Sequence, residues 1–180
     1  MERMKNLLKG VALVAGLFIS TQVVNAQQKI GHINSGEILQ STADFKTAAD
    51  QLKALTETKE KEFQGMVTVY TEKQTAYNDK LRNRSEANKT TVDTELQTLG
   101  EEMRQIEGRI QEIQKVSQEE LGKKEQELFA PIQQKVMTAI NAVAQEKGYA
   151  YVLDLAAGSV IYFQGGEDIS ADVKAKLGVK

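Results

Sequence analysis

The sequence predicts an α+β fold in which a long antiparallel helical hairpin, a coiled-coil tentacle, projects from a small β-sheet body. From residue 45 to residue 128 the apolar residues form two runs of helical spacing that mirror each other about Glu86 and Ala87. Between Ser35 and Ala130 the sequence is dominated by Glu, Lys, Gln, Thr, Ala and Leu, a composition typical of coiled coils. Short segments rich in branched and aromatic residues flank this region on both sides, as strands do.

The N-terminus has the parts of a secretory signal peptide over residues 1–26. A basic start with three Lys or Arg residues precedes the apolar run 10–19, and small residues lead up to Ala26. That run is much shorter than the roughly 20 residues of a membrane-spanning helix, which argues against the alternative of a retained anchor. We therefore expect cleavage near Ala26 and a soluble, exported mature chain that begins at Gln27.

Composition and charge narrow the classes of function. Cleavage removes three positive charges and one negative charge, so the formal net charge changes from −2 to −4. Lys and Arg are interleaved with Asp and Glu through the helical region, which argues against nucleic acid as a partner and against a histone-like role. The sequence has no cysteine, so we expect neither a disulfide framework nor a lipoprotein anchor.

The first element after the signal peptide is a predicted strand over residues 29–34, followed by a helix that Asn34 or Ser35 caps. His32 is the only histidine of the sequence. Because it has no cysteine or second histidine as a partner for a nitrogen or sulfur metal site, we interpret it as an ordinary strand residue. We expect no metal or other cofactor.

A shared register joins the two helices predicted over residues 45–128. Two antiparallel helices joined by a tight turn place residues equidistant from the turn at one height, so paired residue numbers should have a constant sum. The apolar residues satisfy this rule with sums of 172 or 173. The pairs are Leu81 with Val92, Tyr77 with Leu96, Tyr70 with Met103, Met66 with Ile106, Phe63 with Ile110, Leu52 with Leu121, and Phe45 with Leu128.

The apolar seams of the two helices differ in spacing. On the outgoing helix the seam runs from Leu52 to Leu81 with steps that approximate an 11-residue repeat. On the returning helix it runs from Val92 to Ile113 with the alternating steps of a heptad. This mismatch predicts irregular packing along the arms. Four polar residues interrupt the seam, and we expect their ends to turn toward water: Lys59, Gln74, Ser117 and Lys124.

Glycines weaken the predicted arms. They occupy positions 65, 100, 108 and 122, and each costs about 1 kcal/mol relative to alanine inside a helix. The residue numbers of Gly65 and Gly108 also sum to 173, so these two helix-weakening glycines lie at one height along the hairpin. We interpret them as a hinge at which the arms bend, with incidental placement as the alternative.

Three valines, Val67, Val69 and Val116, lie off the predicted seam. They are candidates for an inner surface that holds another chain, and scattered exposed valines are the alternative. The tip, residues 79–93, has interleaved and nearly balanced charges, as a solvated turn does.

Residues 27–44 and 129–180 are predicted to form the β-rich body and oligomerisation region. Pro131 should kink the returning helix, which then continues to the glycine stop at Gly148. Residues 149–155 and 159–163 are predicted to be the two strands of a β-hairpin.

A short final helix, capped by Asp168 or Ser170, completes the body. Asp154, Asp168 and Asp172 are the only carboxylates of the sequence that suggest acid–base catalysis. A strand-end position for Asp154 and helix capping for Asp168 and Asp172 explain them better, so we expect no enzyme. The hairpin leaves too little compact core for a stable monomer, and we therefore expect an oligomer.

The residues that carry a family resemblance are the signal peptide, the long charged hairpin and three short segments, 29–34, 149–154 and 168–173. With these features the mature chain resembles the Skp (OmpH-like) family of periplasmic chaperones along its whole length. The resemblance implies a homotrimer whose β-rich body carries three helical tentacles around a cavity. In that cavity the family holds unfolded outer-membrane proteins for delivery to the outer membrane, without ATP.

The chain departs from the family in its charge. The best-known members are strongly basic with positive tentacle tips, whereas this chain is acidic. This difference argues against the contact with anionic lipid or lipopolysaccharide that the resemblance would imply. The predicted function is an ATP-independent periplasmic holdase that prevents client aggregation. The alternative is a structural coiled-coil spacer or scaffold of the cell envelope. A spacer should have a regular seam, so the interrupted seam favours the holdase.

Overall fold

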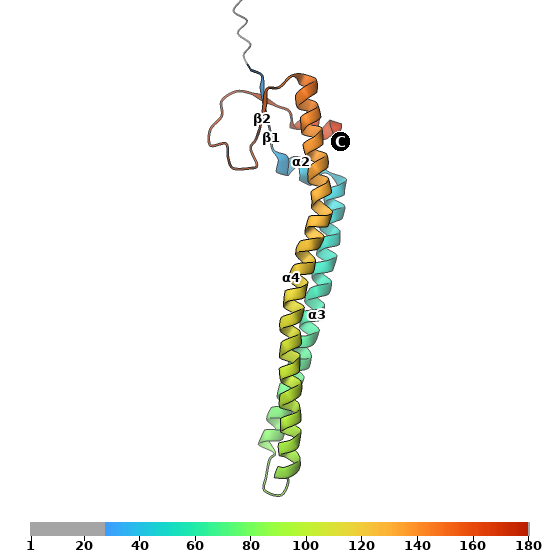
Figure 1. Ribbon diagram of the computed structural model, residues 1–180, viewed down its shortest axis with the longest axis vertical. Coiled ribbons are helices and arrows are strands. Elements are labelled where there is room, and N and C mark those ends of the chain that lie inside the picture. Colours follow the sequence, from blue (N-terminus) through green and yellow to red (C-terminus); the bar gives the residue numbers. More distant parts are fainter. Residues whose placement is uncertain (1–27, 180) are drawn as a thin grey trace, which may run out of the picture.

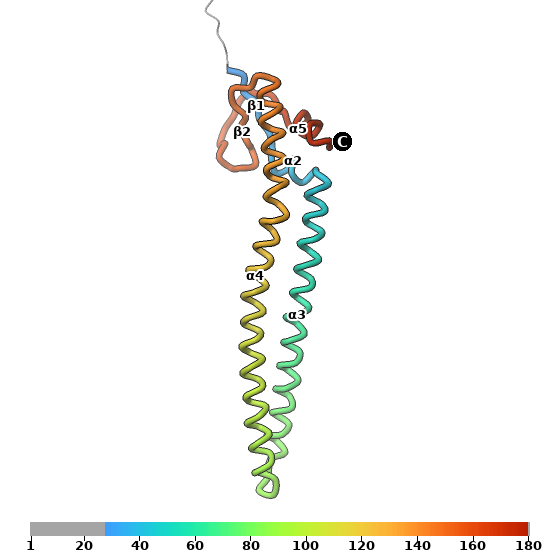
Figure 2. The backbone as a smooth tube through the Cα atoms, turned by 45° about the vertical axis from the view of Figure 1, so that its right-hand side comes forward, coloured from blue at the N-terminus to red at the C-terminus, as the bar shows by residue number. Residues whose placement is uncertain are grey.

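A computed structural model describes residues 28–179 of the chain, so the predicted signal peptide lies outside the described residues. A small head holds both ends of this range, and two long helices run side by side away from it to a distant turn (Figures 1 and 2). The elements in chain order are β1 Ile30–Ile33, α2 Ser35–Ser41, α3 Ala43–Arg82, α4 Lys89–Lys147, β2 Tyr151–Asp154, β3 Glu167–Asp168 and α5 Ser170–Lys176.

Two capping residues determine where the first helices begin. Asn34 caps α2 by accepting a hydrogen bond from the Glu37 N–H at 3.1 Å, as predicted. Thr42, which is buried, ends α2 and starts α3, because its hydroxyl oxygen accepts from the Phe45 N–H at 3.2 Å. The segment after β1 is therefore two helices with a break at Thr42, which redirects the chain from the head into the arm.

The inward-facing residues of α4 confirm the predicted heptad on the returning helix. Leu96, Leu99 and Ile106 are buried, and Val92, Met103, Ile110 and Ile113 are half-buried. Ser117 and Lys124, two of the predicted polar interruptions, are also half-buried and continue the inward face toward the head.

The outer half of the α3 seam was predicted wrongly. Gln74 is exposed and Leu81 is 51% exposed, whereas Lys73 and Lys80 occupy the inward positions. Half-buried residues follow alternating steps of 4 and 3 from residue 52 to residue 80, so α3 also has a heptad and the predicted mismatch of periods is absent. The physical reason is that a lysine stem packs between helices while its ammonium reaches a carboxylate on the partner helix.

The register of the hairpin lies close to the predicted one. The ring of Phe45 packs 5.1 Å from that of Phe129, the neighbour of its predicted partner Leu128. The residue numbers of ion pairs between the helices have larger sums, 175 to 179. Long side chains lean toward the N-terminus of their own helix, so each lysine meets a carboxylate that lies nearer the head than the residue level with it. These pairs include Lys80 with Glu95, Lys73 with Glu102, and Lys59 with Glu120.

Helix α4 links the arm to the head without interruption. It continues through Pro131, so the predicted boundary at residue 129 falls inside a helix. It ends, as predicted, at Gly148, whose φ of 72° is the left-handed conformation that glycine adopts most readily. Because α4 spans both regions, the head and the arm share one structural element.

The head contains a three-stranded sheet whose strands are all parallel, in the order β2-β1-β3. The predicted hairpin of residues 149–155 and 159–163 is wrong, because residues 159–163 form no strand in the structure. The third strand is instead β3, and it pairs with the other side of β1. Strands β2 and β3 lie on opposite sides of β1 and run in the same direction, so the chain between them is a long loop rather than a tight turn.

The core of the head lies between the sheet, α2, α4 and α5. Ile38, Ile169 and Val173 are fully buried against Val136 and Ile140 of α4. The final helix α5 has Ile169 at its N-cap, with no side-chain cap, rather than the predicted Asp168 or Ser170. Asp168 still accepts a hydrogen bond from the Ser170 N–H at 2.9 Å. The aliphatic core thus anchors the base of the arm to both ends of the chain.

Candidate functional site

A lysine interrupts the packing of the arm about halfway along its length. The side chain of Lys59 is only 17% exposed, and its ammonium forms ion pairs with Glu120 at 2.7 Å and Glu62 at 3.4 Å. The hydrogen bond to Glu120 is the largest cause of a raised pKa for Lys59, so the lysine is charged at neutral pH. The inward position is therefore filled by an aliphatic stem whose charged end is held at the edge of the seam.

The seam is open on both sides of Lys59. One hollow, of about 430 Å³, is lined by Lys59, Met66, Ile113, Val116 and Ser117 together with charged residues. A second, of about 390 Å³, lies against the same Lys59, Ile113 and Ser117 and is also lined by Phe63 and Leu121. Lysine and serine at neighbouring inward positions of the two helices leave space that two leucines would fill. We call the first of these the Lys59 hollow.

The three predicted contact valines do not share one surface. Val116 lines the Lys59 hollow, and Val67 lines a shallow hollow of about 500 Å³ on α3 that also includes Thr71 and Thr75. Val69 is exposed and lines neither hollow. Val116 was predicted as a contact residue, whereas its neighbours Met66 and Ile113 were not, because both belong to the seam and were assigned to packing alone.

The predicted hinge glycines have no packing requirement. Gly65 and Gly108 are exposed, and a Cβ added to either would meet nothing within 4 Å. A Cβ added to Gly100 or Gly122 would likewise meet nothing within 4 Å. All four glycines could therefore be alanine without a clash, so their effect in the arm is on helix propensity rather than on contacts.

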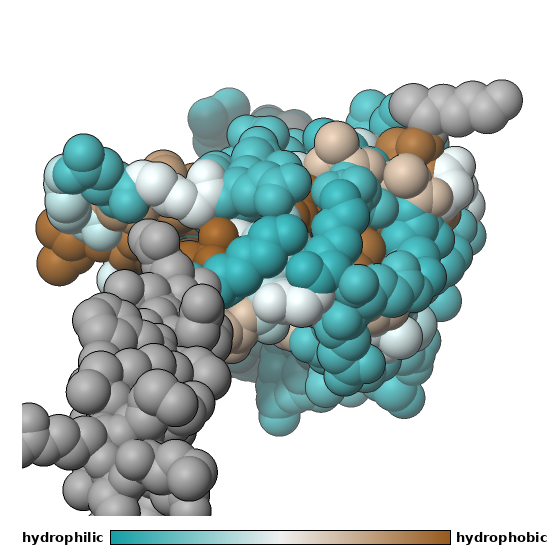
Figure 3. All heavy atoms as spheres, turned by 90° about the horizontal axis from the view of Figure 1, so that it is seen from above, coloured by the Kyte–Doolittle hydropathy of each residue, from teal (hydrophilic) through white to brown (hydrophobic). Residues whose placement is uncertain are grey.

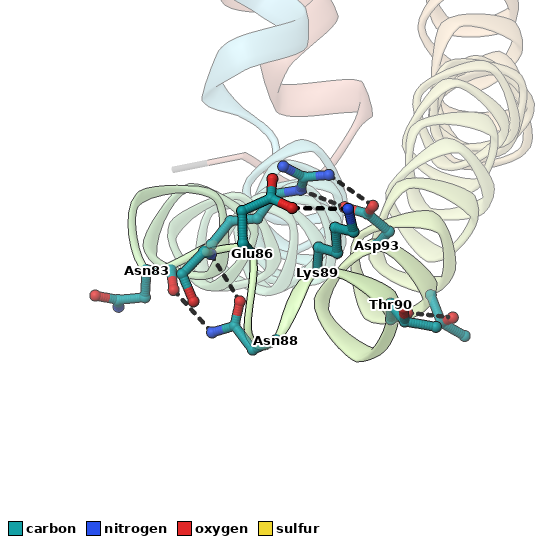
Figure 4. A network of polar contacts seen from close by, with 9 residues as sticks. Asn83, Glu86, Asn88, Lys89, Thr90 and Asp93 are labelled. Carbon is teal, nitrogen blue, oxygen red and sulfur yellow. Dashed lines mark hydrogen bonds and ion pairs between the residues drawn. The ribbon is translucent and has the colours of Figure 1, made fainter.

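The tip of the hairpin is held together by polar contacts (Figure 4). Arg84 donates two hydrogen bonds to Asp93, and this pairing is the main cause of the lowered pKa of Asp93. Lys89 pairs with Glu86 at 2.7 Å. Lys80 and Arg82 also have carboxylate partners, so each cation in the tip has a carboxylate within ion-pair distance. The tip is a closed polar turn rather than a positive patch.

The head has an uncovered apolar loop. Ile161 is 99% exposed and Tyr162 is 77% exposed, while the ring of Phe163 lies 5.1 Å from that of His32. Hydrophobic side chains at the free end of this loop stand out in the view from above (Figure 3). Strand β2 lies beside the loop in sequence and forms an edge of the sheet. The apolar composition of residues 159–163 was visible in the sequence, where it predicted a strand rather than an exposed surface.

A second apolar surface of the head lies between α2, α4 and β2. It is a hollow of about 400 Å³ whose lining includes Leu39, Met137, Ile140 and Val152. Met137 is exposed although it is large and apolar. This surface was not predicted from the sequence.

The acidic residues of the head serve structural roles. Asp154 accepts hydrogen bonds from the Ser35 N–H and hydroxyl, and Asp172 pairs with Lys147. The hydrogen bond from Tyr149 is the largest cause of the lowered pKa of Glu167. The three aspartates of the sequence analysis thus have separate partners and do not converge on one site. Among the described residues, no three His, Cys, Asp or Glu side chains gather as a metal site.

Comparison with protein families decides the assignment. The sequence model of the family described as "Outer membrane protein (OmpH-like)" matches residues 29–177, which is most of the chain. The chain belongs to the OmpH-like family. The resemblance drawn from the terminal segments and the charged hairpin is thereby confirmed.

A solved structure has the same fold as this OmpH-like chain. It is that of a candidate outer membrane chaperone (OmpH-like) from Caulobacter crescentus CB15, with a TM-score of 0.65, 19% sequence identity and coverage of 83% of each chain. No curated protein matches the chain. Between residues 28 and 179 no helix has both the length and the apolar character that crossing a membrane requires.

Proposed function

We propose that this OmpH-like chain is an ATP-independent periplasmic holdase chaperone. In this proposal three copies assemble through their heads, and their arms surround a cavity that holds unfolded outer-membrane proteins and prevents their aggregation. Family membership supports a chaperone role, as does the description of the Caulobacter protein that shares the fold. Cleavage of residues 1–26 would place the mature chain in the periplasm.

The observation that carries the proposal is the combination of an uncovered apolar head with a projecting arm. Ile161 and Tyr162 are side chains that a lone chain leaves in water, and β2 is an edge strand with an unpaired side. Residues 159–163 of one copy would add to the head of the next copy. Because the donating loop and the accepting edge are different surfaces, the contact is heterologous, and a three-fold rotation between copies would close it into a ring.

Three arms carried by such a ring would enclose space without forming a rigid site. Each arm has an interrupted seam and glycines that lower its helix propensity, so it can bend to fit clients of different size. Many weak contacts with a flexible cavity stabilise the unfolded client against aggregation without a specific pocket or nucleotide. A structural spacer would gain nothing from these interruptions.

The charge distribution limits the partners in this proposal. The cations of the tip have carboxylate partners, so the tip offers little attraction to anionic lipid or lipopolysaccharide. The balanced charge of the arms likewise does not suit nucleic acid. The partners proposed are unfolded outer-membrane proteins and further copies of the chain.

An aggregation assay tests the proposal directly. A denatured outer-membrane β-barrel protein is diluted from urea with and without the mature chain, with no nucleotide, and light scattering is recorded. We expect scattering to be suppressed once the chaperone trimer is in molar excess over the client. Unchanged scattering would remove the holdase function, and a monomeric mass of the pure chain by multi-angle light scattering would remove the cavity.

A further inference from the structure

The Lys59 hollow is a recess of the arm with an apolar floor. Met66, Ile113 and Val116 supply apolar walls from both helices, and the volume of about 430 Å³ lies within the range of small-molecule pockets. Methionine suits such a wall, because its flexible, polarizable side chain adapts to ligands of different shape. The recess exists because Lys59 and Ser117 do not fill the seam between them.

An arginine at the rim of the hollow indicates which kind of side chain the hollow binds. Arg109 lines the hollow, and none of the ion pairs among the described residues includes its guanidinium. A guanidinium without a carboxylate partner is available to stack on the face of an aromatic ring. The carboxylates of Glu62 and Glu112 line the same hollow and disfavour an acidic side chain by repulsion. The apolar floor beside the guanidinium favours an aromatic side chain over an aliphatic one.

We propose that the Lys59 hollow receives aromatic side chains of the unfolded outer-membrane client. This inference rests on the proposed holdase function. The strands of outer-membrane barrels alternate apolar and polar residues, and aromatic girdles flank their apolar band at both membrane interfaces, so a client supplies rings near the ends of its strands. One ring enters the hollow between Met66 and Val116, and the neighbouring polar residues of the client strand remain over the charged rim.

Lys59 keeps the hollow open between clients. Its stem occupies an inward heptad position, but its ammonium is drawn to Glu120 and Glu62 at the edge of the seam. A leucine at this position would pack across the seam against Ile113 and fill the space. The open seam costs the arm packing energy, and client binding recovers part of that cost by covering the apolar walls.

The substitution Lys59→Leu tests this inference with a variant that should fold at least as well as the wild type. We expect it to raise the melting temperature of the arm and to raise the Kd for a denatured outer-membrane β-barrel protein about tenfold, as the loss of one buried ring predicts. Fluorescence titration of the client measures the Kd, and circular dichroism measures melting. The matched control is Lys124→Leu, which changes another half-buried seam lysine outside this lining.

Two surface variants test the same hollow without altering the seam. Val116→Asp places a carboxylate at its mouth, whereas Val69→Asp makes the same change at an exposed valine that does not line it. We expect only Val116→Asp to weaken client binding. If the wild type binds client and Lys59→Leu and Val116→Asp bind within about twofold of it, or no more weakly than their controls, the inference is overturned. A wild type that binds no client overturns the proposed function itself.

Discussion

At the scale of single residues, aspartates of the head accept hydrogen bonds from backbone N–H groups of neighbouring segments. Asp154, at the end of β2, accepts from the Ser35 N–H at 3.1 Å and from the Ala156 N–H at 3.0 Å. Burial raises the pKa of Asp154, but the hydrogen bonds from Ser35 and Ala156 outweigh this effect, so the pKa lies below its usual 3.8. The pKa of Asp168 is lowered mainly by the hydrogen bond from the Ser170 backbone.

These lowered pKa values predict acid sensitivity of the head. A carboxylate whose pKa is lower in the folded chain binds fewer protons there than in the unfolded chain. Its contribution to stability is therefore complete above the usual pKa of 3.8 and is lost as the pH falls through the lower folded value. We expect the free energy of unfolding, measured by urea titration, to fall below about pH 4.

The substitution Asp154→Ala should reproduce much of this loss at neutral pH. It leaves the Ser35 N–H and hydroxyl without their acceptor, which costs about 1–3 kcal/mol of unfolding free energy. Asp50→Ala, at an exposed position of α3, is the control and should change stability by less than about 0.5 kcal/mol. Equal stability of the two variants at pH 7 would contradict the role assigned to Asp154.

At the scale of elements, the hairpin illustrates which parts of a helix pair can be predicted from sequence. The seam of α4 was found correctly because apolar residues occupy nearly all of its inward positions from Val92 onward. The outer seam of α3 was missed because its inward residues are Lys73 and Lys80, which pair with carboxylates of α4. A pattern based on hydropathy assigned those positions to Gln74 and Leu81, since it does not register a lysine stem as packing.

The sheet illustrates a different limit. Residues 159–163 have strand composition but pair with no strand among residues 28–179, whereas Glu167–Asp168 has no strand composition and pairs with β1. The pairing of β3 is set by the adjacent α5 and the core residue Ile169, which position it beside β1. Local propensity does not contain this tertiary information. The Lys59 hollow was likewise beyond the sequence, since it depends on side chains of both helices at one height.

The glycines of the arm yield a prediction at the same scale. Replacing Gly65 and Gly108 together by alanine should stabilise the helices by about 1 kcal/mol each, because neither added Cβ meets another atom. If these glycines are a hinge, the stiffer arms should also narrow the distribution of distances in small-angle X-ray scattering. The control is the pair Gly100→Ala and Gly122→Ala, which should stabilise the helices similarly and leave the spread of the arms unchanged. An unchanged spread in the first pair would contradict the hinge.

At the scale of the whole molecule, the single chain leaves large apolar side chains exposed on its head. Its core comprises a few aliphatic residues around Ile38 and Val173, while Ile161, Tyr162 and Met137 remain exposed on the same head. The arm adds length but little core, since most of its inward residues are only half-buried. Such a distribution is typical of a subunit whose remaining apolar surface is covered by other copies.

Ile161 allows this conclusion to be tested apart from the folding of the chain. Because its side chain is 99% exposed, Ile161→Asp removes no contact within the chain and should leave helix content by circular dichroism unchanged. If residues 159–163 join one head to the next, the same substitution buries a carboxylate in an apolar contact, which is strongly unfavourable. We therefore expect the mass by multi-angle light scattering to fall from a trimer to a monomer. Leu81→Asp, at the exposed tip of α3, is the control and should leave the mass unchanged. A trimeric Ile161→Asp variant would place the contact between copies elsewhere on the head.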